Sequence, residues 1–267
     1  MSNNLRSLLF VPATERRLKK IGSCQTDAYI IDLEDSISQE DKESALLLVK
    51  QYLKVSDNVA SNIYVRINKD RRQNELSILN EFPVGVVLPK FDLYDDYADV
   101  QALLNDRFVI AMIESPKALF NAERIAALPW VNALAFGAED FTSISNMYNS
   151  YENLIYPKSV VSLAAKANGK KSFDSPCFHI HDELLLQEEL NQALRLGFDG
   201  KLAIHPKQLG VINQSYEMGN IDCFQRIIDI FEKSGNAVCE IDGQVYEKMH
   251  VDRMKRIISS SVNNIQQ

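Results

Sequence analysis

Two neighbouring stretches decide the fold, Phe108-Val-Ile-Ala-Met-Ile-Glu-Ser-Pro116 and Asn132-Ala-Leu-Ala-Phe-Gly-Ala-Glu-Asp-Phe141. Each begins as a short apolar run, the pattern of a strand that is buried on both faces. Each then ends in acid, at Glu114 in the first stretch and at Glu139 and Asp140 in the second. Because buried carboxylates need a positive partner, these strand ends indicate one shared cation, for which we expect Mg²⁺. The alternative is a rim of solvated acidic residues.

The same pattern recurs along the chain. Apolar runs bounded by turn residues predict strands at Ser7–Pro12, Ala28–Asp35, Asn62–Asn68, Gly85–Lys90, in the two stretches quoted above, and at Ser175–Asp182 and Gly200–Pro206. Helical periodicity fills gaps between them, at Lys42–Leu53, Glu75–Asn80, Ala118–Ala127 and Glu183–Leu196. Eight parallel strands that alternate with helices are typical of a closed (β/α)₈ TIM barrel, whose active site lies where the strands end. The predicted fold class is therefore α/β.

The last part of the chain exceeds what closing a barrel requires. Apolar residues recur on one helical face between Cys223 and Lys233, and a further helix is predicted over Val251–Val262. We therefore predict a single TIM-barrel domain over residues 1–267, with the barrel at about 5–215 and a C-terminal helical tail at about 220–267. We expect this tail to pack on a neighbouring subunit, although a tail folded back on its own barrel fits the sequence equally well.

The composition is that of an ordinary protein of a reducing, cytoplasmic compartment. The net charge is −7, and no basic stripe interrupts the acidic chain, which argues against a nucleic-acid partner or an anionic membrane. The four cysteines are scattered without a Cys-x-x-Cys pair, as expected for reduced thiols. No apolar run approaches the roughly 18 residues of a membrane span.

Arg66 is a charged residue inside an otherwise apolar strand, so an acid or an anionic ligand must neutralise it. A guanidinium is suited to bidentate contact with a substrate carboxylate. A structural ion pair with Glu34 or Asp35 is the alternative. Strand alternation puts Asp32 and Glu34 on one side and Asp35 on the other. We expect Glu34 and Asp35 to orient Arg66 and metal-bound waters.

Other patterns carry less information. His179 and His181 stand at strand spacing, but a metal site built from this pair is less favoured than ordinary packing or hydrogen bonding. His205 is expected to cap the eighth strand. The signatures of dinucleotide-binding, P-loop and serine-hydrolase sites are absent from the sequence, which disfavours these three kinds of chemistry.

The ordered motifs resemble those of the HpcH/HpaI aldolase/citrate lyase family, and in particular of citrate lyase β-subunit-like proteins. The resemblance covers roughly residues 5 to 250. The matching motifs are Arg6-Ser-Leu-Leu-Phe-Val-Pro12, Asp32-Leu-Glu-Asp-Ser36, Val65-Arg-Ile-Asn68, Leu88-Pro-Lys90, Ile113-Glu-Ser-Pro116, Gly137-Ala-Glu-Asp140, Asp174-Ser-Pro176, Gly197-Phe-Asp-Gly200 and Ile204-His-Pro206.

The resemblance implies a Mg²⁺-dependent barrel that forms or cleaves carbon–carbon bonds next to a carbonyl group. It implies that Glu114 and Asp140 hold the metal and that Arg66 binds the substrate carboxylate and the developing oxyanion. It further implies a homo-oligomer, a trimer or a hexamer. Additional substrate contacts are expected at matching motif positions, namely Pro12, Lys90 and Ala138.

Two departures from the family pattern refine the expected activity. Asp35 stands where the aldolase branch has a histidine base, which points to the branch that acts on acyl thioesters of coenzyme A or an acyl carrier. Glu247 stands where a C-terminal aspartate usually reaches a neighbouring active site, and Met249 replaces the proline that follows it. We therefore expect Glu247 to act as the acid or base, with altered geometry.

The expected reaction is cleavage of a citramalyl-, malyl- or citryl-type thioester to an acetyl thioester and a 2-oxo acid. The same site would also suit the reverse condensation, hydrolysis of the thioester, or a coenzyme A-independent aldolase. A degenerate barrel that serves as a subunit of a larger complex is the non-enzymatic alternative. The joint presence of Arg66, Glu114 and Asp140 argues against it.

Overall fold

The computed structural model describes residues 5–55, 62–94, 97–104, 106–218 and 221–262. The chain divides into two compact units, Met1–Asn213 and Gln214–Gln267, which are described separately below. The first unit contains the barrel, and the second contains the C-terminal tail.

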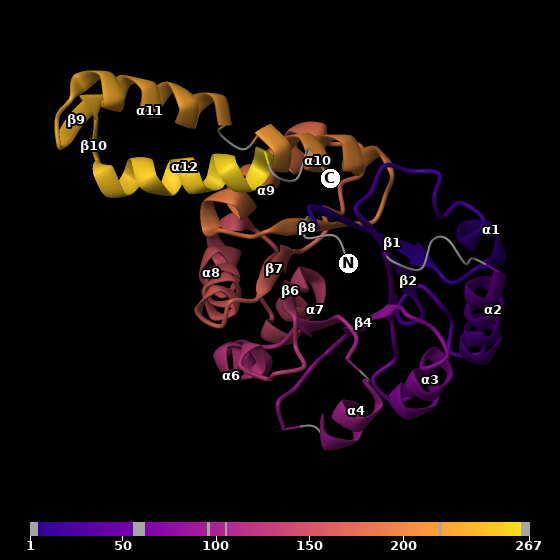
Figure 1. Cartoon of the computed structure of the whole chain (residues 1–267). Helices are drawn as coiled ribbons and strands as arrows, with labels where there is room; N and C mark the ends of the chain where they lie inside the picture. The colour runs from indigo at the N-terminus through magenta and orange to yellow at the C-terminus, as the bar shows by residue number, and fades with distance from the viewer. Residues whose placement is uncertain (1–4, 56–61, 95–96, 105, 219–220, 263–267) are drawn as a thin grey trace. The chain divides into compact units, whose positions relative to one another are not determined.

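The first unit is a closed barrel of parallel strands in the order β1 to β8, with helices around the outside of the strand ring (Figure 1). This arrangement confirms the predicted TIM barrel. The strands are β1 (Ser7–Pro12), β2 (Ala28–Asp32), β3 (Ile63–Arg66), β4 (Gly85–Leu88), β5 (Val109–Ile113), β6 (Ala133–Phe136), β7 (Lys171–Asp174) and β8 (Gly200–Ala203). The helices are α1 (Glu15–Leu18), α2 (Lys42–Val55), α3 (Arg72–Leu79), α4 (Tyr97–Leu103), α5 (Pro116–Leu119), α6 (Ala122–Ala126), α7 (Ala138–Ser145), α8 (Tyr151–Ala167), α9 (Glu183–Leu196) and α10 (Lys207–Met218).

Two apolar layers explain why the strands are hydrophobic on both faces. Side chains that point inward, among them Ile30, Tyr64 and Phe173, form a cluster inside the barrel. Side chains that point outward, such as Ile31 and Val65, pack against the helices in a larger cluster. Because both faces are buried, the strands appear in the sequence as continuous apolar runs.

The seventh strand was predicted wrongly. The predicted strand Ser175–Asp182 is a loop followed by the start of α9, and β7 is the more polar segment Lys171–Asp174 that precedes it. Pro176 cannot donate a ladder hydrogen bond, whereas Asp174 in the true strand pairs with Lys201 of β8. His179 and His181 consequently lie in an exposed loop and not on a strand.

Element boundaries differ elsewhere in ways that matter for the site. The predicted helix Ala118–Ala127 is two short helices, α5 and α6, because Ser115 caps the first one and the chain turns again at Asn121. The helix α9 ends at Leu196 as predicted, and Gly197, with a positive φ of 85°, forms its C-terminal cap. Three strands end earlier than predicted, so the polar residues Glu34, Asn68 and Lys90 lie in the loops after β2, β3 and β4.

The second unit consists of the end of α10, the helices α11 (Ile221–Ser234) and α12 (Lys248–Val262), and the antiparallel pair β9 (Val238–Ile241) and β10 (Gln244–Glu247). Asp242 and Gly243 join the two strands with φ values of 53° and 80°, which suits a two-residue hairpin turn. Ile227, Ile228 and Phe231 of α11 are buried together as the helical periodicity predicted. No helix in the described part of the chain is long and apolar enough to cross a membrane.

Candidate active site

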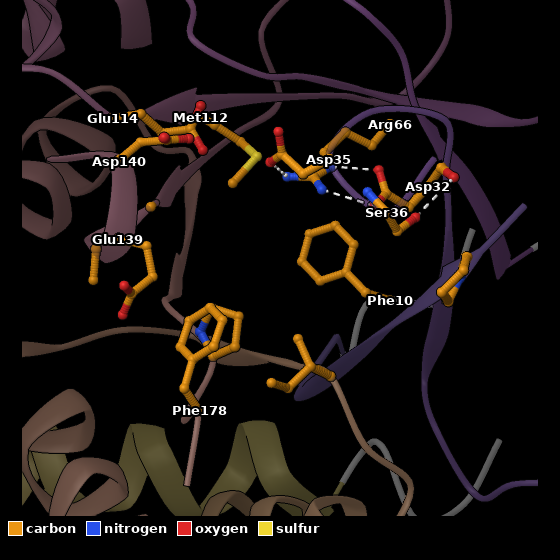
Figure 2. Close-up of a pocket in the computed structure, with 15 residues that line it drawn as sticks. Phe10, Asp32, Asp35, Ser36, Arg66, Met112, Glu114, Glu139, Asp140 and Phe178 are labelled. Carbon is orange, nitrogen blue, oxygen red and sulfur yellow. Dashed lines mark hydrogen bonds and ion pairs between the residues drawn. The ribbon is translucent and has the colours of Figure 1, made fainter. Parts of the chain in front are cut away.

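A cavity of about 370 Å³ lies at the C-terminal ends of the barrel strands (Figure 2). Its lining residues come from strands and from the segments that follow them, far apart in the sequence, and they combine charged groups with an apolar wall. They are Phe10, Pro12, Asp32, Asp35, Ser36, Arg66, Met112, Glu114, Gly137, Ala138, Glu139, Asp140, Pro176, Phe178 and Ile204.

Glu114 and Asp140 lie side by side at one end of this cavity, as Figure 2 shows. Glu114 directly follows β5, and Asp140 lies in the first turn of α7, just after β6. The Glu114 side chain is almost fully buried, and one of its oxygens accepts a hydrogen bond from the backbone N–H of Lys90. Burial raises the pKa of Glu114 to about 7. Glu114 and Asp140, which come from the two stretches quoted at the outset, therefore lie next to each other in the cavity.

Gly137 leaves the space that the Glu114 side chain occupies. A Cβ atom at this position would lie 2.4 Å from Cγ of Glu114, which is far inside van der Waals contact. Only glycine leaves room for the Glu114 carboxylate between β5 and β6.

The donor set fits Mg²⁺ better than an ion that requires a complete protein cage. Among the described residues, no group of three or more His, Cys, Asp or Glu side chains is arranged to hold a metal ion. Mg²⁺ commonly takes one or two protein carboxylates and fills its other positions with water and substrate oxygens. Glu114 and Asp140 provide such a pair beside open space, and a cation would relieve the burial of the Glu114 carboxylate.

Arg66 lies on the other side of the cavity with its guanidinium group held by a fork of hydrogen bonds. Its Nε and Nη2 donate to the two oxygens of Asp32 at 2.7 and 2.8 Å, because the β2–β3 register places these residues opposite each other. Its Nη1 lies 3.2 Å from Glu34 and 3.1 Å from Asp35. Although burial opposes it, the hydrogen bonds and charge of Arg66 hold the pKa of Asp32 below its usual range. The guanidinium also lies over the Phe10 ring, 4.8 Å from its centroid.

Lys90 joins the two sides of the site. Its Nζ atom lies 2.7 Å from Glu34, 3.2 Å from Asp35 and 3.6 Å from Asp140. Burial favours the neutral amine, but the Glu34 hydrogen bond and the surrounding carboxylates raise the pKa of Lys90. Burial raises the pKa of Glu34, although the charges of Arg66 and Lys90 act to lower it.

The site carries an excess of negative charge. When all groups are ionised, five carboxylates face two cationic side chains, which leaves three uncompensated negative charges. The carboxylates are Asp32, Glu34, Asp35, Glu114 and Asp140, and the cations are Arg66 and Lys90. A divalent cation would offset most of this excess.

A buried polar network fixes the turn after β2. Lys42 of α2 donates to the carbonyl oxygens of Leu33 and Glu34. The Asn68 amide donates to the Leu33 carbonyl at 2.9 Å and to the Glu75 carboxylate at 2.6 Å. This network holds Glu34 and its neighbour in place, and helical periodicity alone gives no sign of it.

The predicted site residues divide between the two units. Pro12 and Ala138 line the cavity, and Lys90 contacts two of its lining residues, Asp35 and Asp140. Glu247 ends β10 in the tail unit, where its side chain is exposed and its backbone N–H donates to Nδ1 of His250 at 3.0 Å.

Sequence reasoning missed three features of the site. It did not identify Asp32 as the main partner of Arg66, although strand pairing offers the signal. It did not place Lys90 against the acids. It also missed the apolar wall formed by Phe10, Met112 and Phe178, whose side chains are drawn in Figure 2.

Comparison with known proteins identifies relatives of this chain. Residues 6–206 match the family model described as HpcH/HpaI aldolase/citrate lyase. The chain is 28% identical to the citrate lyase subunit beta of Leuconostoc mesenteroides subsp. cremoris, over 95% of this chain and 92% of that protein. It is 29% identical to a (3S)-malyl-CoA thioesterase of Cereibacter sphaeroides, over 96% of this chain and 94% of the relative.

A solved structure shows the same fold. The citrate lyase beta subunit from M. tuberculosis, complexed with oxaloacetate and magnesium, superposes with a TM-score of 0.68 at 27% identity, covering 80% of this chain and 97% of that chain. The family match spans the whole barrel and includes every strand end that forms the cavity. This protein belongs to the HpcH/HpaI aldolase/citrate lyase family.

Proposed function

We propose that this protein is a Mg²⁺-dependent carbon–carbon lyase. Its substrate is a 3-hydroxy-3-carboxyacyl thioester of coenzyme A or an acyl carrier, and its products are an acetyl thioester and a 2-oxo acid. The observation that carries the proposal is the pairing of Glu114 with Asp140 in the cavity that also contains Arg66. The magnesium and oxaloacetate in the M. tuberculosis relative, and the thioester in the name of the C. sphaeroides relative, support it.

Glu114 and Asp140 would hold the metal. Bound Mg²⁺ supplies Lewis-acid polarisation of the oxygen atoms of the substrate's hydroxyl and carboxylate groups. Gly137 keeps the Glu114 carboxylate in position, and the Lys90 N–H fixes one of its oxygens.

Arg66 would bind the substrate's anionic groups. Asp32 fixes one edge of the guanidinium, so the Nη1 edge that now contacts Glu34 and Asp35 is the edge that a substrate oxygen would meet. Glu34 and Asp35 therefore act as orienting groups that hold Arg66 toward the cavity. An already oriented cation of this kind stabilises developing negative charge without further reorganisation.

The chemical step requires one proton acceptor and one proton donor. Loss of the hydroxyl proton lets the bond between the second and third carbons break, and its electron pair passes to the thioester as an enolate. Arg66 offsets the enolate charge, and protonation of the enolate carbon releases the acetyl thioester. We assign both roles to Glu247 from a neighbouring subunit of a trimer or hexamer, with residues 220–267 as the tail that carries it. Its carboxylate accepts the hydroxyl proton, and the acid so formed returns a proton to the enolate carbon.

Hydrolysis of the thioester is the second candidate, and the (3S)-malyl-CoA thioesterase relative is the observation that favours it. The two reactions leave different products. Cleavage gives an acetyl thioester and a 2-oxo acid without a free thiol, whereas hydrolysis gives free coenzyme A and a hydroxy acid. Condensation is the reverse of cleavage and is distinguished by supplying acetyl-coenzyme A with a 2-oxo acid.

The test is to incubate the protein with malyl-, citramalyl- and citryl-coenzyme A, with Mg²⁺ or with EDTA. Acetyl-coenzyme A, the 2-oxo acid and free thiol are measured together. We expect acetyl-coenzyme A with one substrate, lost in EDTA; free thiol in its place would favour hydrolysis, and no Mg²⁺-dependent product would refute the proposal.

Two carboxylates provide matched variants. Asp140→Asn should abolish turnover. Glu123→Gln should retain it, because Glu123 is exposed on α6 and lies outside the set of residues that line the cavity. Full activity of Asp140→Asn at saturating Mg²⁺ would remove Asp140 from the metal site.

A further inference from the structure

Lys90 contacts four of the carboxylates of the site, through its ammonium group and its backbone N–H. Its ammonium group lies 2.7 Å from Glu34 and 3.2 Å from Asp35, which follow β2. It also lies 3.6 Å from Asp140, which follows β6. Its backbone N–H donates to Glu114, which follows β5. One residue after β4 therefore contacts carboxylates that follow β2, β5 and β6.

The backbone at Lys90 is held in an unusual conformation. Its φ of 48° lies in the left-handed region, which costs energy for a residue with a Cβ atom. This conformation belongs to the residue whose N–H and side chain both contact carboxylates of the site. Strain of this kind persists where surrounding contacts fix it, and here the fixing contacts are the acids themselves.

We propose that Lys90 is a positioning residue that serves as the site's built-in counter-cation. Its ammonium group neutralises part of the negative charge of Glu34, Asp35 and Asp140 before a divalent cation binds, and it thereby lowers the affinity of the site for that cation. The inference rests on the proposed metal site of Glu114 and Asp140. Because the ammonium group and the metal share Asp140, like charges approach each other and the binding of Mg²⁺ is weakened.

The direction in which Mg²⁺ affinity changes when Lys90 is replaced distinguishes this role from a merely structural one. If Lys90 only held the loops together, its loss would weaken Mg²⁺ binding by disordering the carboxylates. If it acts as a counter-cation, its loss must tighten Mg²⁺ binding, because the negative charge at Asp140 and Glu34 is then uncompensated. Turnover would fall in either case, so the affinity for Mg²⁺ is the informative quantity.

The experiment is calorimetric titration of metal-free protein with MgCl₂ at low ionic strength. Lys90→Asn removes the ammonium group but tolerates the left-handed backbone, and should lower the dissociation constant for Mg²⁺ about tenfold. Lys90→Gly suits the same backbone and is a second variant with the same expected result. Lys90→Arg retains the charge and should stay within about twofold of the wild type.

Lys69 provides the matched control. It carries the same charge and donates to the carbonyl oxygen of Lys90 at 3.2 Å. Lys69→Asn should change the Mg²⁺ dissociation constant less than about twofold. An equal tightening in Lys69→Asn would attribute the effect to the general field of the protein and would overturn the proposal.

Unchanged or weaker Mg²⁺ binding in Lys90→Asn and Lys90→Gly, with wild-type thermal unfolding, overturns the inference but leaves the metal site intact. A wild-type protein that binds no Mg²⁺ overturns the proposed function and this inference together. The two kinds of failure are therefore distinguished by the wild-type titration alone.

Discussion

The fork between Asp32 and Arg66 should be a major source of stability for the active-site end of the barrel. Both side chains are buried, and two hydrogen bonds of 2.7 and 2.8 Å join them. The Asp32 oxygens also accept from the backbone N–H groups of Glu34 and Ser36 at 2.9 and 3.2 Å. Asp32→Asn preserves the shape of the side chain but removes its charge and one acceptor.

The expected cost follows from these contacts. A hydrogen bond to a charged group contributes about 1.5–3 kcal/mol, and breaking an isolated buried ion pair costs about 3–5 kcal/mol. Asp32→Asn retains one acceptor, and Arg66 keeps Glu34 and Asp35 at 3.2 and 3.1 Å, so the loss falls at the lower end of this range. We expect about 3 kcal/mol, or about 5 °C in the unfolding temperature of a chain of this size.

The pH dependence has a definite sign. Because the folded-state pKa of Asp32 is lowered, its contribution to stability is present above the unfolded-state value of about 3.9 and is lost as the pH falls through the folded-state value. The difference between wild type and Asp32→Asn should therefore be constant from about pH 5 to 8 and shrink below about pH 4.

Urea unfolding followed by circular dichroism measures this difference. A double-mutant cycle with Arg66→Gln should give a coupling energy of about 2 kcal/mol, and Glu139→Gln serves as an exposed-carboxylate control. Equal stability of Asp32→Asn and wild type at pH 7, with no coupling to Arg66, would refute the ion pair as the element that holds the site.

Three further predictions concern the metal and the proton donor. Burial raises the pKa of Glu114 to about 7, so Mg²⁺ should displace a proton from about half of the metal-free molecules at pH 7. Calorimetry in buffers of different ionisation enthalpy should show this proton release, which should fade above about pH 8. Mg²⁺ binding without proton release at pH 7 would contradict the prediction. Gly137→Ala should weaken Mg²⁺ binding at least about tenfold, because its Cβ would lie 2.4 Å from Cγ of Glu114. Gly210→Ala, with nothing within 4 Å, is the control that should leave binding unchanged. Glu247→Gln should slow turnover without altering Mg²⁺ affinity, and a wild-type rate would exclude it from the mechanism.

The barrel was predictable because burial on both faces makes parallel strands into continuous apolar runs. β7 was missed for the same reason. Phe173 fills the barrel interior, but its neighbours Ser172 and Asp174 are buried by polar contacts with Asp199 and Lys201, so the segment looks polar in the sequence. A buried ion pair hides a strand from a search for hydrophobicity.

The hairpin between Val238 and Glu247 was missed although the sequence contains its turn. Asp242-Gly243 is a strong signal for a two-residue turn, and both residues adopt positive φ. The strands beside it are mostly exposed, so they lack the apolar alternation by which strands are recognised. The turn residues are therefore the clearest sequence signal for this element.

The acids of the site were predictable as components, whereas their pairing was not. Arg66 lies 34 residues from Asp32, and Lys90 lies 56 residues from Glu34, so no short motif contains both partners. Barrel closure decides the pairing, because neighbouring strands deliver Asp32 and Arg66 to the same height. Loops after alternate strands then place Lys90 between groups that follow β2 and β6. A sequence therefore specifies which charges reach the mouth of a barrel, and strand register specifies which of them neutralise one another. The excess of negative charge that favours a bound cation can be counted only after both are known.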